Sequence, residues 1–275
     1  MTTDAPAAVE PVPRGIGRLV GNRLVDWIPA AVVLVLVLVL WQEAQTLFRI
    51  QNFLLPKPTL IASTFWDSHG TLLRAGWTTF QEALGGFAIG SGAAVLLALV
   101  LARWRPVGRA LMPYAIAANA VPIIAFAPIA NAWFSPFSKT SKMAIAAVLC
   151  FFPVLVNMLR GLTSVRPQSI ELMQSYAAGQ LEIFRRVRLP TALPYLFTAL
   201  KVASVLSMIG AIVAQYFGGT SDDLGVIIRS SYQVFAYREA WAGILVACAF
   251  GIAFYLAISL AERLTLRWLS PSTSE

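Results

Sequence analysis

Charged, cysteine and histidine residues are scarce in this chain. Charged side chains make up 12% of its 275 residues, whereas soluble domains carry about 25%. Histidine occurs once, and the two cysteines, Cys150 and Cys248, lie in apolar runs without a Cys-x-x-Cys spacing. A soluble domain, a disulfide framework and a metal site are therefore not expected. The Gly-x-x-x-x-Gly-Lys-Ser/Thr pattern of a P-loop is also missing, so the chain cannot hold ATP in the P-loop manner.

Hydrophobic residues make up 58% of the chain and lie mostly in long runs. A helix needs roughly 20 such residues to cross the bilayer. A strand in the first run is excluded because an open strand leaves its backbone groups unsatisfied in lipid. The sequence therefore predicts an all-α, multi-pass protein of the cell (plasma or inner) membrane. We expect six transmembrane helices, at about residues 27–48, 72–102, 110–133, 142–162, 191–217 and 240–264.

The net charge of +8 reflects membrane topology. The basic residues mostly flank apolar spans and form no single stripe, so nucleic acid is not an expected partner and lipid is. With both termini in the cytoplasm, more lysines and arginines fall on the inner side than on the outer side, as the positive-inside rule requires. We expect a cytoplasmic tail at residues 1–26, one transmembrane domain at residues 27–268 and a C-terminal tail at residues 269–275.

The second span contains an acid and several glycines. Glu82 lies one or two turns inside its outer end, where an acid is a functional candidate but more often snorkels to the interface or pairs. The glycines have the spacing that suits close helix contact, at positions 85, 86, 90 and 92. No other feature of the chain indicates how two copies would pair.

The third span is interrupted by Pro113, Pro122 and Pro128. Prolines free backbone carbonyls, which membrane helices tolerate where they line protein or a water-filled cavity. A broken helix beside a translocation path and a packed structural kink are both consistent with this pattern. If the path interpretation holds, its candidate residues are Asn119, Pro122, Phe126, Pro128, Asn131, Asn157, Ser204, Ser207 and Gln215.

Two segments are expected outside the membrane. In the first, the Leu-Pro-Lys-Pro at residues 55–58 forbids a continuous helix, so a short amphipathic helix is expected at residues 59–66 and a turn around His69. In the second, glycines and aspartates at residues 218–225 predict turns. A short helix at residues 226–235 follows them.

A polar and basic stretch at residues 171–194, ELMQSYAAGQLEIFRRVRLPTALP, separates two apolar runs. Ile170, Met173 and Ala177 fall on one helical face, and an apolar face on a loop in water usually marks a partner surface. Gly179 can turn the chain. A second short helix from Gln180 would then end at Leu189-Pro190.

The spacing of Glu171, Ala177, Val187 and Leu189-Pro190 resembles the coupling loop of permease subunits of binding-protein-dependent ABC importers. The family pattern is Glu-Ala-Ala, three residues, Gly, nine residues, a branched apolar residue, any residue, Leu-Pro. Here Leu and Met at positions 172 and 173 replace the two alanines, and Ala177 replaces the glycine. The flanking VPIIAFAPIANAWF and LPYLFTALKVASVLSMIGAIVAQYFGG are similar to the nitrate, sulfonate, taurine and thiamine-precursor branch.

This resemblance implies a type I ABC importer permease. Its partners would be two copies of an ABC ATP-binding subunit, an extracytoplasmic substrate-binding protein and a second permease copy, as a homodimer. The chain itself would be no enzyme and bind no cofactor, because ATP and Mg belong to the ATP-binding subunit. Within a coupling loop at residues 166–190, the residues that contact the ATPase would be Glu171, Leu172, Met173, Ser175, Tyr176, Ala177, Ala178, Gly179, Leu189 and Pro190.

The replacement of the family glycine leaves two possibilities for the turn. Either the reversal has moved to Gly179, or Ala177 lies in a helix and only its small size matters. Both predict that Ala177→Gly is nearly silent and that Gly179→Val is damaging. Glu171 would begin the first coupling helix, where the helix dipole favours an acid, so Glu171→Lys would uncouple transport.

Two other functions compete with the importer. An ion-coupled secondary transporter would be expected to carry acids or histidines inside the membrane, whereas this chain offers only Glu43 and Glu82 near the outer interface. A membrane anchor without transport activity is the second alternative, against which the proline-interrupted third span argues.

Overall fold

The computed structural model describes residues 16–51, 55–118 and 122–267. These residues form helices joined by short connections, and no strand occurs among them. The fold divides into a unit at Met1–Leu60 and a larger unit at Ile61–Glu275. The prediction of an all-α multi-pass membrane protein is confirmed.

The smaller unit contains α1, at Ile16–Leu47. Its apolar part, Ile28–Leu47, has 20 residues and is long enough to span the bilayer. Helix α2 begins at Pro58 at the edge of this unit and continues into the larger one.

Helix α2 runs without interruption over Pro58–Arg103, 46 residues. At 1.5 Å per residue this is about 70 Å, far more than the hydrocarbon thickness. The expected break after Pro58, with a separate short helix at residues 59–66, is wrong. A proline is well accommodated at the first helical position, where its missing N–H has no partner to lose. His69 is exposed, as expected, but lies in the helix and not in a turn.

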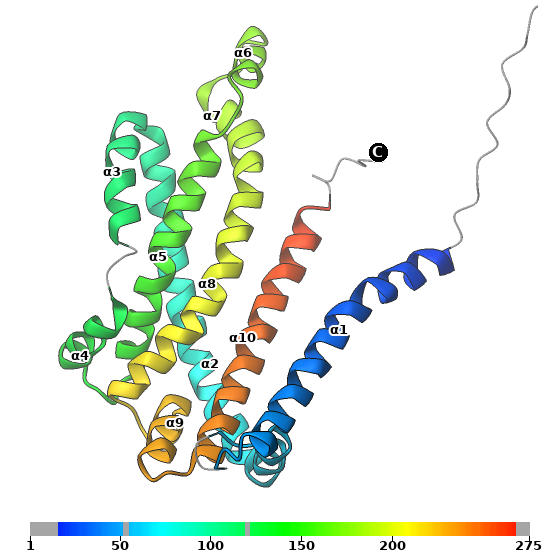
Figure 1. Cartoon of the computed structure of the whole chain (residues 1–275). Helices are drawn as coiled ribbons and strands as arrows, with labels where there is room; N and C mark the ends of the chain where they lie inside the picture. Colours follow the sequence, from blue (N-terminus) through cyan, green and yellow to red (C-terminus); the bar gives the residue numbers. More distant parts are fainter. Residues whose placement is uncertain (1–15, 52–54, 119–121, 268–275) are drawn as a thin grey trace, which may run out of the picture. The chain divides into compact units, whose positions relative to one another are not determined.

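The third predicted span is two short helices, α3 at Arg105–Ala118 and α4 at Ile123–Phe134 (Figure 1). The expected interruption is confirmed, and it falls just before the α4 N-cap, Pro122. Pro113 and Pro128 lie inside the two helices without ending them.

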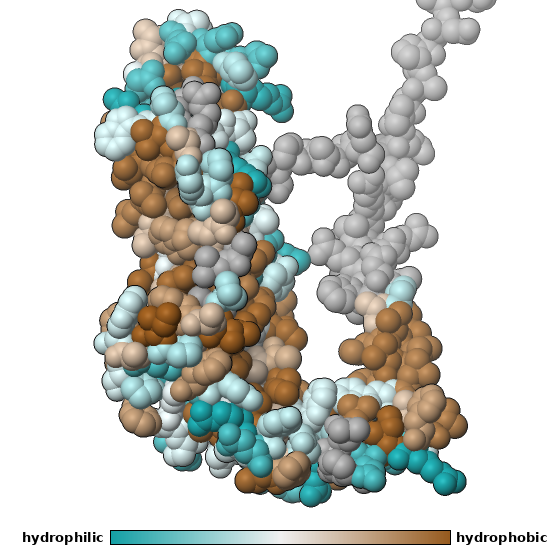
Figure 2. Space-filling view, turned by 60° about the vertical axis from the view of Figure 1, so that its left-hand side comes forward, coloured by the Kyte–Doolittle hydropathy of each residue, from teal (hydrophilic) through white to brown (hydrophobic). Residues whose placement is uncertain are grey.

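Three further long helices complete the larger unit: α5 at Lys139–Thr163, α8 at Leu189–Phe217 and α10 at Tyr237–Thr265. The expected short helix after α8 is present as α9, at Leu224–Gln233. Among the described residues five helices are long and apolar enough to cross a membrane, and α4 adds a shorter apolar helix. Figure 2 shows the apolar band over the middle of the larger unit, with hydrophilic residues gathered toward its two ends.

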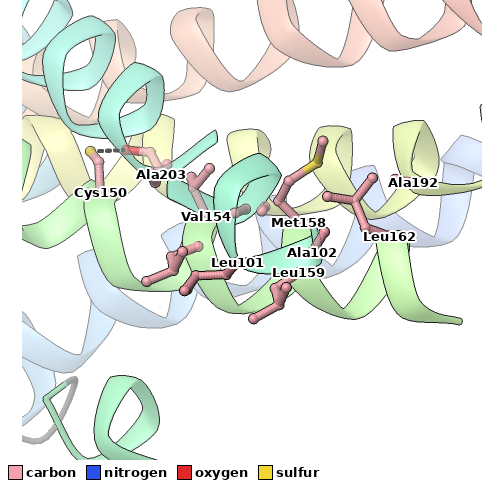
Figure 3. Close-up of a cluster of buried hydrophobic side chains, with 13 residues drawn as sticks. Leu101, Ala102, Cys150, Val154, Met158, Leu159, Leu162, Ala192 and Ala203 are labelled. Atoms are coloured by element: carbon pink, nitrogen blue, oxygen red, sulfur yellow. Dashed lines mark hydrogen bonds between the residues drawn. The ribbon is translucent and has the colours of Figure 1, made fainter. Parts of the chain in front are cut away.

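Helices α2, α5 and α8 share the core of the larger unit (Figure 3). Cys150 belongs to this core and its thiol donates to the carbonyl of Ala203 at 3.3 Å, so the cysteine is structural. Small residues let the helices approach: a Cβ on Gly210 would lie 2.8 Å from the Cα of Ala146, and one on Gly161 would lie 2.9 Å from the Cα of Ala192. Close approach matters here because helices in lipid associate through van der Waals packing.

Glycines of α2 also allow close helix packing within this chain. Gly86 and Gly90 lie against α5, where a Cβ on Gly86 would meet the side chain of Ala146 at 2.4 Å. Gly85 packs against Met143. Gly92 differs, because a Cβ there would meet nothing within 4 Å. The expected close helix contact is therefore confirmed at three of the four glycines, and it lies inside one subunit.

Candidate functional site

The predicted coupling loop lies at one end of the larger unit, beyond the ends of α5 and α8 (Figure 1). It consists of α6 at Pro167–Ser175, α7 at Gln180–Ile183 and a π-helical turn, η1, at Phe184–Arg188. Pro167 occupies the first position of α6, where proline favours helix initiation. Both predicted short helices are thus present.

The reversal after α6 is centred on Ala177. Its φ of 57° is left-handed, its N–H donates to the carbonyl of Gln174 at 2.9 Å, and the N–H of Ala178 donates to the carbonyl of Met173 at 3.1 Å. This pair of bonds is a Schellman motif, which requires a left-handed residue just past the helix end. Gly179 is extended instead, with φ −70° and ψ 162°.

Both expectations for the turn are therefore wrong: the reversal has not moved to Gly179, and Ala177 is not helical. The position where the family pattern has glycine still adopts the conformation that glycine favours. Ala177 adopts it against the Cβ penalty of a left-handed residue, about 1–2 kcal/mol.

Exposed apolar side chains cover the loop. Leu172, Tyr176 and Leu181 are 57%, 76% and 69% exposed. Ile170 and Met173 on the predicted apolar face are half-buried. The outward apolar surface is therefore formed by Leu172, Tyr176 and Leu181, and Leu181 was not among the predicted contact residues.

The second half of the loop is continuous with α8. The N–H of Leu189 donates to the carbonyl of Phe184, five residues back, so the π-helical turn leads directly into the long helix. The expected end of the helix at Leu189-Pro190 is wrong, because Pro190 lies in the first turn of α8. Because α7, η1 and α8 follow one another as one continuous helix, a displacement of α7 would also move the transmembrane helix α8.

The charges of the loop are arranged differently from the prediction. Glu171 is exposed and is the fifth residue of α6, beyond the first turn, so it receives little support from the helix dipole. Arg186 and Glu182 form an exposed ion pair at 3.2 Å, of a type that contributes little to stability.

A cavity of about 1260 Å³ lies between α6 and one face of α3, and residues of α2 and α5 complete its wall. Its walls are mainly apolar, and Glu171 and Gln174 supply its polar groups from α6 together with Thr163 from α5. The remaining lining residues are Leu101, Gly108, Met112, Pro113, Ile116, Ala117, Leu159, Val165, Pro167 and Ile170.

The candidate path residues do not converge on an open route in this conformation. Ser204 and Ser207 are fully buried and donate to carbonyls of their own helix. Asn157 does the same toward Pro153, at 2.8 Å. Asn131 is 5% exposed, donates to the carbonyl of Ala214 at 3.4 Å and accepts a bond from Ser141. Phe126 is half-buried, Pro122 and Pro128 are exposed, and Asn119 lies outside the described residues.

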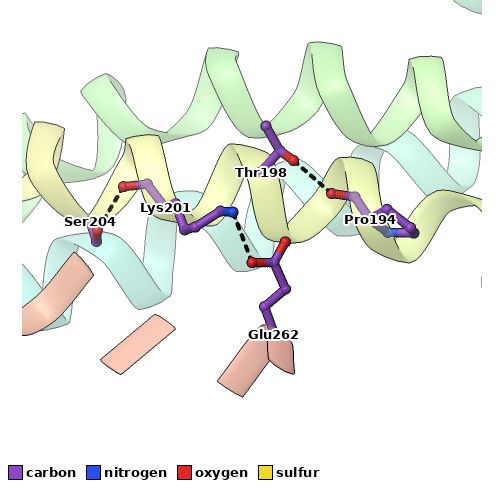
Figure 4. Close-up of polar contacts among 5 residues, drawn as sticks. All are labelled: Pro194, Thr198, Lys201, Ser204 and Glu262. Atoms are coloured by element: carbon purple, nitrogen blue, oxygen red, sulfur yellow. Dashed lines mark hydrogen bonds and ion pairs between the residues drawn. The ribbon is translucent and has the colours of Figure 1, made fainter. Parts of the chain in front are cut away.

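An ion pair joins α8 to α10 one helical turn before Ser204 (Figure 4). Lys201 Nζ lies 2.8 Å from Glu262 Oε2, and both side chains are about one-fifth exposed. Each charge compensates the other in surroundings where an unpaired charge is expensive. The pair therefore ties the two helices together.

A buried polar cluster fastens α2 to the last turns of α8 and the first turn of α9. Gln215 Nε2 donates to Glu82 Oε2 at 2.7 Å, and Gln215 Oε1 accepts from the N–H of Gly225 at 2.9 Å. Thr79 Oγ1 accepts from the N–H of Leu224 at 3.2 Å. Glu82 is 1% exposed, so the expected snorkelling to the interface is wrong, and the carboxyl group instead accepts a hydrogen bond from the neutral amide of Gln215.

Removing Gln215 should destabilise the protein strongly. Gln215→Leu leaves the Glu82 carboxylate and the Gly225 N–H buried without this partner, and each such loss costs roughly 1–3 kcal/mol. We expect the midpoint of thermal unfolding in detergent to fall by several degrees. Gln81→Leu, a glutamine replacement at an exposed position of α2, is the control. Equal midpoints for the two variants would contradict a stabilising role for the cluster.

Comparisons with known proteins agree with this architecture. A family model described as "Binding-protein-dependent transport system inner membrane component" matches residues 86–275. The riboflavin transport system permease protein RibX of Chloroflexus aurantiacus is 32% identical over 263 residues, which cover 94% of this chain and 97% of RibX. The formylaminopyrimidine transport permease protein ThiX of Halalkalibacterium halodurans is 31% identical over 85% of this chain and 92% of its own length. The taurine transport system permease protein TauC of Escherichia coli is 25% identical over 86% and 87%.

The resemblance to permease subunits of binding-protein-dependent ABC importers, and the branch assignment, are thereby confirmed. The assignment of residues 171–190 as the coupling loop stays a prediction. An ion-coupled transporter and an anchor without transport activity are disfavoured by the same matches. The chain belongs to the binding-protein-dependent transport system inner membrane components and is a transmembrane permease subunit of an ABC importer.

Proposed function

We propose that the coupling surface of this permease is the outward apolar set Leu172, Tyr176 and Leu181, and that a separate ATP-binding subunit grips it. The proposal is supported by the solvent exposure of these three residues, which is 57–76%, on a loop that lies beyond the membrane spans. An apolar patch in water usually marks a partner surface. Because α7 passes directly into α8, closure of the ATPase would move a transmembrane helix.

This assignment also suggests on which side of the membrane the loop lies and how the subunits of the transporter are arranged. A loop that binds an ATPase lies in the cytoplasm, which places both termini there as the basic residues predict. Two permease copies, as a homodimer, would meet two ATPase subunits, and an extracytoplasmic binding protein would dock at the opposite end, where α4 and α9 lie (Figure 1). ATP and Mg would be held by the ATPase, and this chain would hydrolyse no ATP.

The translocation path would form between the transmembrane domains, residues 27–268, of the two permease copies. The proline-interrupted α3–α4 segment supports a position beside it. Ser204, Ser207 and Gln215 have no exposed surface, so they would reach a path only if the packing around α8 changed during transport.

The sequence similarities favour a small heterocyclic solute. The relatives at 32% and 31% identity are named for riboflavin and formylaminopyrimidine transport. Mass spectrometry of the ligand that copurifies with the cognate binding protein identifies the solute. A sulfonate or nitrate there would contradict this substrate class.

Copurification with the ATPase subunit tests the coupling surface. We expect the permease alone to hydrolyse no ATP, and the assembled complex to hydrolyse it faster with the loaded binding protein. Leu172→Ser with Tyr176→Ser should abolish copurification. The matched control, Tyr232→Ser with Val234→Ser, changes side chains that are 55% and 70% exposed at the other end of the unit and should leave copurification intact. Hydrolysis by the permease alone, or an intact complex with the loop variant, would refute the assignment.

A further inference from the structure

A second cavity lies at the same end of the larger unit and has a different chemistry. Its volume is about 700 Å³, and it opens between the end of α2, α6, α7 and η1. Both Ile170 and Gln174 of α6 line this cavity as well as the larger one, so α6 has a hollow on each side. The lining residues are Leu99, Ala102, Arg103, Ile170, Gln174, Gln180, Leu181, Phe184 and Arg188.

The charges of this cavity are of one sign. Arg103 and Arg188 contribute guanidinium groups from two different elements, and no carboxylate is among the lining residues. Arg103 is exposed and forms no ion pair with any residue in the described part of the chain. Gln174 and Gln180 add amide groups that can donate hydrogen bonds. Guanidinium groups arranged in this way suit an anion with several oxygens, above all a phosphate.

The rest of the wall is apolar and belongs to the membrane boundary. Leu99 and Ala102 come from the last turns of α2, and Phe184 comes from the turn that precedes α8. Trp104, next to Arg103, is 57% exposed, and exposed tryptophan is typical of the membrane–water interface. A ligand that enters here meets both positive charge and apolar side chains.

We propose that this cavity binds the phosphate headgroup of an anionic phospholipid between Arg103 and Arg188. Basic pockets between transmembrane helices at a membrane surface recognise such headgroups. The ATPase is a less suitable occupant, because Leu181 is the one coupling-surface residue that lines the cavity, whereas Leu172 and Tyr176 do not. A bound lipid would connect the end of α2 to η1 beside α6 and so hold the loop against the bundle. This inference does not depend on the transported solute or on the ATPase.

Binding of fluorescent phosphatidylglycerol to the purified full chain in neutral detergent tests the site. We expect Arg103→Gln to weaken binding roughly fivefold, and Arg103→Gln with Arg188→Gln roughly thirtyfold, from about 1 kcal/mol per basic residue. Arg103→Lys should keep most of the affinity. Arg186→Gln is the matched control, because it removes a loop arginine that lies outside the cavity and should change nothing.

Competition separates the possible sources of the anion. Unlabelled phosphatidylglycerol should displace the probe, whereas phosphatidylcholine, inorganic phosphate and glycerol 3-phosphate should not at matched concentrations. Displacement by inorganic phosphate would make a free anion the ligand and overturn the lipid assignment. If Arg186→Gln weakened lipid binding as much as Arg103→Gln, or if Arg103→Gln did not weaken it, the proposed site would be wrong. Arg103 is exposed, so its variants remain informative even if replacement of Arg188 prevents folding.

Discussion

Ala177→Val should weaken coupling to the ATPase by roughly tenfold or more, whereas Gly179→Val should be tolerated. Ala177 has a φ of 57°, and a β-branched residue in that region is a steric outlier. Valine there would break the Schellman motif and release the carbonyls of Met173 and Gln174 that it satisfies. Gly179 has an ordinary extended φ of −70°, and a Cβ added to it meets nothing within 4 Å.

The expected magnitude follows from the conformational population of the loop. A strain of about 2 kcal/mol would reduce the fraction of loops with the docking geometry by more than tenfold, and the apparent affinity for the ATPase falls in proportion. Ala177→Gly removes the Cβ penalty and should bind the ATPase at least as tightly as the unchanged chain. Affinity for the ATPase subunit and substrate-stimulated ATP hydrolysis measure both effects. Loss of coupling in Gly179→Val, with normal coupling in Ala177→Val, would show that the turn is organised around the glycine after all.

The position of this loop was predictable from the sequence, but the conformation of its turn was not. The spacing from Glu171 to Leu189-Pro190 identified the loop and its family, because that spacing is carried by consecutive residues. The expected conformation at Ala177 is wrong because the position in the motif, and not the nearest glycine, determines where the chain turns. A left-handed alanine is disfavoured on its own, and it is held here by two backbone hydrogen bonds that only the folded loop provides.

The long helices were predictable for a simpler reason. The apolar runs that became α5, α8 and α10 have polar residues at both ends, so hydropathy marks their limits within a few residues. The expected start of α2 is too late because a proline pair also suits the beginning of a helix, and Pro58 begins this one. The cluster around Gln215 was not predictable, because it joins α2 to α8 and α9, far away in the sequence, and no local pattern records that contact.

The packing of α2 on α5 predicts a large effect of a single substitution on stability. A Cβ on Gly90 would lie 2.2 Å from the carbonyl oxygen of Ala147 and 2.8 Å from its Cα. These are backbone atoms, so no side-chain rotation relieves the overlap and the two helices would have to separate. Overpacking of this kind costs about 1–3 kcal/mol and sometimes more, and separation would also disturb the shared core of α2, α5 and α8.

Gly90→Ala should therefore destabilise the protein by about 2–3 kcal/mol although alanine is the better helix former by roughly 1 kcal/mol. Gly92→Ala is the matched control: it makes the same change two residues away on the same helix, at an exposed position where the added Cβ meets nothing within 4 Å. It should leave stability unchanged or raise it slightly, since it gains helix propensity without overlap. Reversible unfolding in mixed micelles measures both free energies. If the two variants unfold at the same denaturant concentration, α2 and α5 do not make the close contact on which this packing depends.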